Sequence, residues 1–197
     1  LREAVTIPVV FLDFYDHELA NDAVIADNFY GMYQMTEVLL ERGMKEIGFI
    51  GSIYSTSSIM DRYCGFMKAM TQHRLNVHPK WLIEDRNAQG IVEFELPRRL
   101  PEAFVCNCDL VAGMLVYKLN ERGLKVPDDV SVVGFDNFLY PGYADMKITT
   151  YEVNTKAMVR VAIKKLMKQF KNPNSGRGLE IVSGHVVMKN SVRRNVP

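Results

Sequence analysis

Short apolar runs, each too short for a helix, recur along the chain and predict buried β-strands. The first run covers residues 7–12 and ends on Asp13. Another covers residues 130–133 and leads directly into Gly134-Phe135-Asp136. The other predicted strands cover residues 47–51, 81–83, 103–106, 148–151 and 181–188.

Segments with apolar residues at helical spacing separate most of these runs. The predicted helices cover residues 28–42, 59–73, 107–122 and 156–170, and a shorter helix is expected to run toward Arg99. Gly43 and Gly123 follow two of these helices, as is common at helix C-termini. Strands that alternate with helices, and that are apolar almost throughout, indicate an α/β fold with a parallel sheet covered on both faces.

Polar side chains follow four of the predicted strands. They are Asp13, the serines after Gly51, Asn107 and Asp136. The carboxyl ends of parallel strands meet at one edge of a sheet, and ligands of open α/β folds bind at that edge. The pattern therefore predicts a cleft lined with hydrogen-bonding groups.

Composition narrows the possible functions. The chain has 197 residues, is 48% hydrophobic and carries a formal net charge of +1, so it can bury a core but offers no strongly basic surface of its own for nucleic acid. Its basic pairs Arg98-Arg99, Lys164-Lys165 and Arg193-Arg194 are interpreted as solvated faces. No apolar run approaches the roughly 18 residues of a membrane span.

No motif for covalent or metal-dependent chemistry is found. Cys64, Cys106 and Cys108 lack metal-ligand spacing, and their odd number suggests core packing in a reducing compartment. There is no glycine-rich phosphate loop and no nucleophile elbow, and the four histidines are scattered. We therefore expect a protein that is not an enzyme and that uses no cofactor or metal.

Arg62 is the sharpest single candidate for a binding residue. It follows the polar segment 55–58 and stands near the start of a helix whose other face is apolar. Two interpretations stay open: a solvated helix arginine, or a guanidinium that donates to vicinal hydroxyls or to a ligand carboxylate. Asn107 also has two interpretations, because it could cap the following helix or bind a ligand hydroxyl.

Five segments carry a resemblance to a known family. In order they read IPVVFLD, ADNFYGMYQMTEVLLERGMKEIGFIG, SSIMDRYCGFMKAM, AFVCNCDLVAGMLVYKLNERGLKVPDDVSVVGFDN and ITTYEVNTKAMVRVAIKKL. They resemble the effector-binding domain of LacI/GalR-type bacterial transcription regulators, over essentially the whole chain. The segments S-x-x-x-R-x-x-GF and VPDDVSVVGFD are specific to that family within the wider periplasmic-binding-protein-like fold.

The resemblance implies two lobes, each a parallel sheet flanked by helices, with an effector in the cleft between them. Residues 1–27 and 149–178 would form the remnant of an incomplete first lobe, and residues 28–148 and 179–197 would form the second lobe. The chain begins at Leu1 without an initiator methionine, so we expect a piece of a longer protein. The rest of the first lobe and a helix-turn-helix headpiece would lie upstream.

The resemblance also implies roles for particular residues. Arg62, Asn107 and Asp136 stand at the family's effector-contacting positions. Asp13 and Ser58 stand at positions that often line the cleft. These five residues, together with the Arg86 position, form the expected effector-binding set.

Three departures from the family pattern affect this expectation. Cys108 replaces the acidic residue that usually follows the asparagine, and Asn137 follows Asp136 where a second acid is common. Arg86 occupies a loop position where sugar-binding members often place an aromatic ring. If Arg86 faces the cleft, it favours an anionic or highly hydroxylated ligand. If it points outward, it says nothing about the ligand.

The expected function is effector sensing in a cytoplasmic, homodimeric transcription regulator. A small ligand, a sugar or sugar derivative, would shift the angle between the lobes and alter the affinity of the headpiece for operator DNA, without membrane contact. Helix 109–120, with Leu110, Met114 and Tyr117, is a candidate for the dimer interface, and burial in its own lobe is the alternative. The alternative function is a secreted solute-binding protein of a sugar transporter, which shares the fold.

Overall fold

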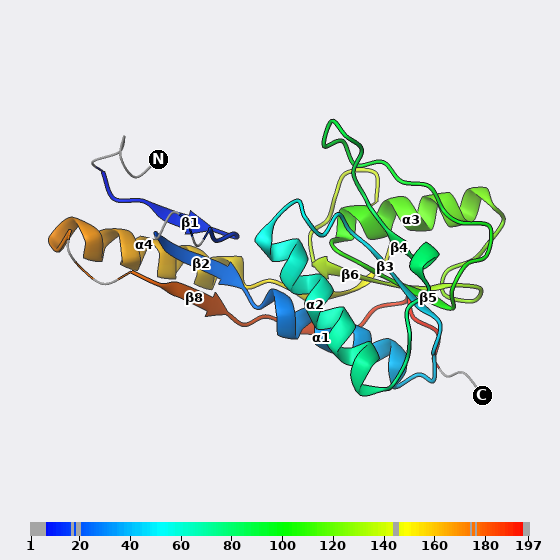
Figure 1. The fold of residues 1–197 in the computed structure, drawn as a ribbon. Helices are drawn as coiled ribbons and strands as arrows, with labels where there is room; N and C mark the ends of the chain where they lie inside the picture. Colours follow the sequence, from blue (N-terminus) through cyan, green and yellow to red (C-terminus); the bar gives the residue numbers. More distant parts are fainter. Residues whose placement is uncertain are drawn as a thin grey trace.

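Two separate β-sheets organise the chain, and Figure 1 shows them side by side. The computed structural model describes residues 7–16, 18, 21–143, 146–173, 175 and 177–194. The smaller sheet has three parallel strands in the order β1 (Val10–Leu12), β2 (Asp22–Ala26) and β8 (Leu179–Val182). Helix α4 (Thr155–Lys171) packs against β1 and β2, and together these elements form the first lobe.

The larger sheet forms the second lobe and has six strands. Their order is β4 (Leu82–Ile83), β3 (Ile47–Ile50), β5 (Ala103–Cys106), β6 (Ser131–Asp136), β7 (Thr149–Glu152) and β9 (His185–Val187). All neighbours pair in parallel except β9, which runs antiparallel to β7. A short 3-10 helix, η1 (Pro79–Trp81), leads into β4. The α/β architecture with helix-flanked parallel sheets is thus confirmed.

Helices cover both faces of the larger sheet. Helices α1 (Asn28–Leu40) and α2 (Ser57–Gln72) pack against each other and contribute to one hydrophobic core, whereas α3 (Asp109–Glu121) contributes to the other. Side chains fix the starts of three helices. Asp27, Thr56 and Asn154 each accept a hydrogen bond from a backbone N–H in the first turn of α1, α2 and α4 respectively. The four long predicted helices are therefore present at nearly their predicted positions.

Two local predictions are wrong, and one strand was missed. Asn107 does not cap α3, because Cys108 occupies the N-cap position and makes no capping hydrogen bond with its side chain. No helix runs toward Arg99, and residues 84–102 are irregular apart from one isolated bridge. The prolines at positions 97 and 101 disfavour helical backbone there. Strand β2 was not predicted, although all five of its residues are buried.

The lobe boundaries also require correction. We expected residues 149–178 in the first lobe, but strand β7 at 149–152 pairs with β6 in the second. We expected residues 179–197 in the second lobe, but β8 at 179–182 pairs with β2 in the first. The single strand predicted at 181–188 is therefore two strands in different sheets. Gly184 separates them, and its Cα approaches the chain so closely that a Cβ would lie 2.0 Å from the carbonyl oxygen of Glu152.

Helices α1 and α2 are in close contact at Gly65. A Cβ added to Gly65 would lie 2.1 Å from the carbonyl oxygen of Phe29 and 3.0 Å from the backbone nitrogen of Tyr33. Both atoms belong to the backbone of α1, so neither can move aside as a flexible side chain would. The packing of the two helices therefore depends on the missing side chain.

We expect Gly65→Ala to lower the free energy of unfolding by about 1–3 kcal/mol through overpacking. The direction of the change is informative. In a helix without such a contact, replacing glycine by alanine stabilises the helix by about 1 kcal/mol. Gly178→Ala is the matched control, since a Cβ there meets nothing within 4 Å. Urea denaturation measures both variants, and a Gly65→Ala protein as stable as the wild type would contradict the close contact.

Candidate functional site

Arg62 is buried at the carboxyl edge of the larger sheet, with 5% of its surface exposed. Its Nε donates to Asn28 Oδ1 at 2.8 Å, and its Nη1 donates to the carbonyl oxygen of Asn107 at 2.7 Å. Its Nη2 lies 3.4 Å from Asp136 Oδ1, and the guanidinium carbon lies 4.0 Å from the ring centroid of Phe135. Arg62 is therefore not a solvated helix residue: it joins α2 to α1, β5 and β6.

Two strand-end carboxylates, Asp13 and Asp136, lie near this guanidinium. Burial raises the pKa of Asp136 to about 6, although Arg62 lowers it, and Asp13 contributes a smaller increase. Burial also raises the pKa of Asp13, again against the attraction of Arg62. The structure thus brings together one carboxylate from each lobe and one guanidinium.

Both carboxylates sit on unusual backbone. Asp13 has a backbone φ of 68° and Asp136 has one of 101°. Residues other than glycine rarely adopt positive φ. Such strain persists only where the surroundings fix it, and it clusters at ligand sites. The cost is consistent with side chains that are held in place for binding.

Ser58 links the two lobes through a backbone contact. Its Oγ donates to the carbonyl oxygen of Asp13 at 2.6 Å, so this hydroxyl fixes the loop after β1. The neighbouring residue Ser57 accepts a hydrogen bond from the backbone N–H of Tyr15 at 3.1 Å. Tyr15 Oη also donates to Asp61 Oδ1 at 3.1 Å. The start of α2 therefore positions the first-lobe carboxylate.

A cavity of about 250 Å³ lies between the lobes. Its lining residues come from both lobes and from the segments that join them: Leu12, Asp13, Asp136, Phe138, Tyr140, Val153, Thr155, Met158 and Val159. The walls are mostly apolar, and the two aspartates are the acidic groups among these residues. This combination of apolar walls with a few converging polar groups is typical of small-molecule sites.

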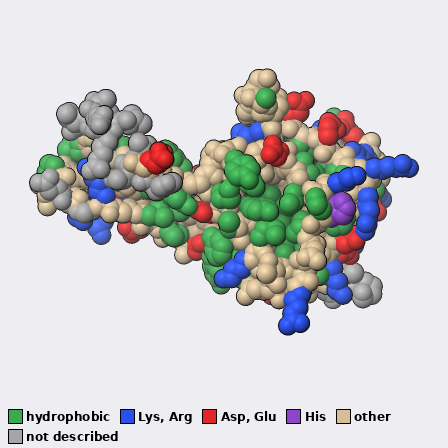
Figure 2. Space-filling view, viewed as in Figure 1, with side chains coloured by type: hydrophobic (Ala, Val, Ile, Leu, Met, Phe, Trp, Pro, Cys, Tyr) green, Lys and Arg blue, Asp and Glu red, His purple; other side chains and the backbone are tan. Residues whose placement is uncertain are grey.

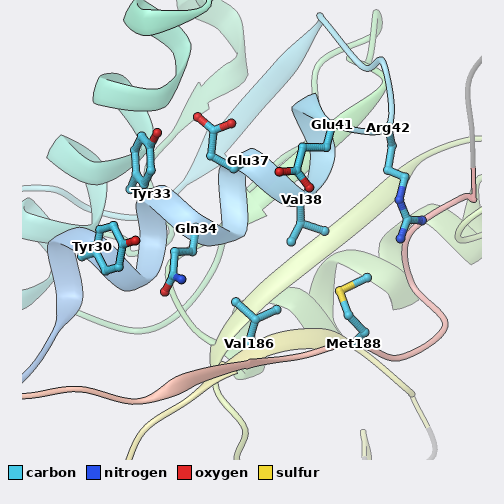
Figure 3. A pocket seen from close by; sticks show the side chains of 9 residues that line it. All are labelled: Tyr30, Tyr33, Gln34, Glu37, Val38, Glu41, Arg42, Val186 and Met188. Atoms are coloured by element: carbon cyan, nitrogen blue, oxygen red, sulfur yellow. The ribbon is translucent and has the colours of Figure 1, made fainter.

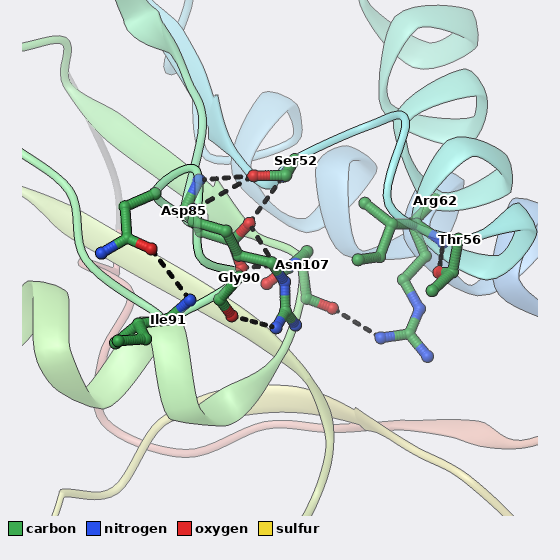
Figure 4. Close-up of polar contacts among 10 residues, drawn as sticks. Ser52, Thr56, Arg62, Asp85, Gly90, Ile91 and Asn107 are labelled. Carbon is green, nitrogen blue, oxygen red and sulfur yellow. Dashed lines mark hydrogen bonds and ion pairs between the residues drawn. The ribbon is translucent and has the colours of Figure 1, made fainter.

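A polar network fastens the loops that follow β3, β4 and β5 (Figure 4). Asn107 Nδ2 donates to Asp85 Oδ2 at 3.0 Å, and Asp85 Oδ1 accepts the backbone N–H of Ser52 at 2.7 Å. Ser52 Oγ in turn accepts the backbone N–H groups of Asp85 and Arg86, each at 3.1 Å. Asp85 is fully buried, and sequence reasoning missed its role although it follows a strand end as the other candidates do.

Asn107 and Arg86 therefore differ from the expected picture. Asn107 reaches Arg62 through its backbone carbonyl, while its side chain faces Asp85 rather than the cavity. Arg86 bends back over its own loop: its Nη1 lies 3.5 Å from the carbonyl oxygen of Gly90, and its Nε lies 3.9 Å from Asp85 Oδ1. Neither side chain lines the cavity between the lobes.

Asp109 is a second buried acid that the sequence did not single out. Burial raises its pKa to about 7, with the Asp136 charge adding to the effect. Its Oδ2 accepts the backbone N–H of Phe138 at 3.0 Å, so it holds the loop that forms one wall of the cavity.

Burial also raises the pKa of the Cys108 thiol to about 11, which leaves this thiol neutral at pH 7.

A second hollow, of about 560 Å³, lies between α1 and the edge strand β9 (Figure 3). Its lining residues are Tyr30, Tyr33, Gln34, Glu37, Val38, Glu41, Arg42, Val186 and Met188. None of these charged side chains is buried, and neither Arg62 nor the strand-end aspartates Asp13 and Asp136 line this groove. The smaller cavity between the lobes is therefore the candidate ligand site.

Among the described residues, no group of three or more histidine, cysteine, aspartate or glutamate side chains could hold a metal ion. No helix in the described part of the chain is long and apolar enough to cross a membrane.

Known sequences provide an independent comparison. The family of periplasmic binding protein-like domains matches residues 36–192. The chain is 24% identical to the ribose operon repressor of Haemophilus influenzae over 96% of this chain and 58% of that protein. It is 31% identical to the HTH-type transcriptional repressor PurR of the same organism, over 87% of this chain and 52% of that protein. The chain thus spans a little over half the length of these relatives, which are named as repressors rather than enzymes.

A solved structure shows the same fold. A LacI family transcriptional regulator from Enterococcus faecium, with bound ribose, superposes with a TM-score of 0.78 at 22% identity, over 94% of this chain and 70% of that chain. The family match covers most of the chain, and both the relatives and the solved structure are transcription regulators. The chain belongs to the periplasmic binding protein-like domain family, and its relatives are regulators of the LacI type.

Proposed function

We propose that the chain is the ligand-sensing part of a LacI-type DNA-binding regulator. A small polyhydroxylated molecule, a sugar or sugar derivative, binds in the cavity between the lobes and modulates operator affinity. The observation that carries the proposal is the cavity itself, where each lobe contributes one strand-end carboxylate and the buried Arg62 stands behind Asp136. The operator is contacted by a headpiece outside this chain, and the protein acts in the cytoplasm.

The chemistry of the cavity favours a neutral ligand that offers hydroxyl groups. Ionised Asp13 and Asp136 are acceptors only, and each can accept hydrogen bonds from sugar hydroxyls. Apolar residues such as Met158 and the ring of Tyr140 can face the C–H surfaces of a sugar. Because Arg86 does not line the cavity, it gives no reason to expect an anion. The names of two relatives, the ribose-bound E. faecium regulator and the ribose operon repressor, support a sugar as the ligand.

Ligand contacts with both lobes would stabilise one interlobe arrangement over others. A ligand shifts such an equilibrium only through differential affinity for the two states. The lobes are joined by the segments β2–α1, β7–α4 and β8–β9, so any change of angle passes through these three connections.

Dimerisation through α3 is the second part of the proposal. Tyr117 is 55% exposed, whereas Leu110 and Met114 are partly buried in their own lobe. The adjoining loop adds Phe138 and Leu139, which are 59% and 66% exposed. Contiguous exposed apolar patches are typical of interfaces, and we infer that these side chains contribute to one. A secreted solute-binding protein would share the fold, but the names of the relatives favour a regulator.

Calorimetric titration with D-ribose and a panel of other pentoses, hexoses and disaccharides tests the function. One sugar should bind saturably to the wild type, and Arg62→Lys should weaken it about tenfold or more, because lysine keeps the charge but loses the planar fork. Arg160→Lys, an exposed change on α4, is the matched control and should bind normally. Circular dichroism checks that each variant is folded. Undiminished binding by folded Arg62→Lys would contradict the role of Arg62 in holding Asp136 at the site.

The strained backbone at Asp136 leads to a second prediction. We expect the free energy of unfolding of Asp136→Gly, measured by urea denaturation, to exceed that of Asp136→Ala by about 1 kcal/mol. Glycine accepts positive φ without strain, whereas alanine does not. Both variants should lose sugar affinity to a similar degree. At Asp129, which does not have positive φ, the order of stability should reverse, with alanine the more stable. The same order at both positions would argue against strain at Asp136.

Sugar affinity should also depend on pH. The raised pKa of Asp136, about 6, means that its carboxylate becomes protonated as the pH falls through 6 and loses acceptor capacity. We expect affinity to fall by up to about tenfold per pH unit below that value. Asp136→Asn should remove this step near pH 6 while binding weakly throughout. A flat profile for the wild type between pH 7 and pH 5 would contradict the role of the ionised carboxylate.

A further inference from the structure

A hollow of about 470 Å³ lies at the opposite edge of the larger sheet from the cavity between the lobes. We call it the η1 hollow, and it is lined by His78, Lys80, Trp81, Pro97, Arg98 and Arg99. Trp81 directly precedes β4, and residues 97–99 lie shortly before β5, so the hollow borders the amino ends of these strands. It is therefore a separate site from the carboxyl-edge cavity.

The η1 hollow is strongly basic. Three of its six residues carry fixed positive charges, and none of the six is acidic. Arg99 pairs with the exposed Glu46, but the side chains of Lys80 and Arg98 contact no carboxylate among the described residues. Figure 2 shows lysine and arginine side chains gathered around a histidine on this end of the second lobe. For a chain of net charge +1, this is a marked local excess.

The buried ring of Trp81 contacts part of this basic cluster. Trp81 is only 4% exposed, and its Nε1 donates to the carbonyl oxygen of Arg99 at 3.1 Å. The guanidinium carbon of Arg99 lies 5.4 Å from the indole centroid, and the ring of His78 lies 5.2 Å from it. Contacts of a cation with an aromatic ring orient the cation without neutralising its charge. The basic groups therefore lie around a fixed aromatic side chain rather than on an open surface.

His78 adds a directed donor. Its Nδ1 accepts the backbone N–H of Lys80 at 3.1 Å, so in the neutral ring the proton resides on Nε2. Nε2–H is then available to donate to a ligand. So are the Lys80 ammonium and the Arg98 guanidinium, which pair with no carboxylate in the described part of the chain. Pro97 borders the hollow and offers an apolar surface beside these donors.

We propose that the η1 hollow binds the phosphoryl group of a small molecule. A phosphate monoester is close to a dianion at neutral pH and carries three strong acceptor oxygens, which match several cations better than a single carboxylate does. The volume exceeds that of a phosphoryl group alone and lies in the range of small-molecule pockets, so the rest of the ligand lies over Pro97. The basic pair Arg98-Arg99, interpreted from sequence as a solvated face, thus becomes part of a site.

The test uses inorganic phosphate and the emission of Trp81, which is the only tryptophan in the chain. Phosphate replaces chloride at constant ionic strength, so that general screening does not change. We expect a saturable change of emission in the wild type. Lys80→Glu and Arg98→Glu should each weaken phosphate at least about tenfold, because each converts an attractive charge into a repulsive one. Both residues are exposed, and circular dichroism checks that the variants are folded.

Arg160→Glu is the matched control, because it makes the same change of charge on α4 and should leave phosphate affinity unchanged. The proposal is overturned by an emission change that does not saturate, or by equal affinity in Lys80→Glu, Arg98→Glu and the wild type. It is equally overturned if a glutamate-rich peptide shifts Trp81 emission and phosphate does not. The proposed sugar site is tested separately, since Asp136→Ala should retain the phosphate response and Lys80→Glu should retain sugar binding.

Discussion

The burial of one guanidinium is the constraint on which the candidate ligand site depends. Arg62 is removed from water, and an unpaired charge in that position would be costly, so its surroundings must supply partners. They come from three other elements: the amide of Asn28, the carbonyl of Asn107 and the carboxylate of Asp136. A planar, forked donor can satisfy all three at once, which a lysine could not. The relative positions of α1, α2, β5 and β6 at the carboxyl edge are thereby linked.

Two consequences follow from this arrangement. The neighbouring loops are fastened by Asp85 and Ser52, so the edge of the sheet behind Arg62 is a connected polar network rather than a set of independent loops. In front of Arg62, Asp136 sits on strained backbone with a raised pKa and faces the first-lobe carboxylate of Asp13 across a small cavity. This network positions the acceptors, and we propose that a ligand binds in the unfilled space beside them.

The sequence predicts the local elements better than their partners. Apolar runs and helical spacing were enough for the four long helices and most strands, because these patterns depend on burial within each lobe. They could not separate β8 from β9, since an apolar run does not state which sheet it joins, and Gly184 marks the break only through a tertiary contact. At the site, residue types indicated Arg62 and Asp136. The direction of the Asn107 and Arg86 side chains depended on Asp85, a contact across loops that spacing alone does not encode.

The most direct measurement is a crystal structure of the chain with the sugar that calorimetry selects. We predict that the sugar occupies the cavity between the lobes, with hydroxyl groups within hydrogen-bond distance of Asp13 and Asp136, and with Arg62 still bound to Asn28. A sugar found in the groove between α1 and β9, or one that contacts neither aspartate, would contradict it.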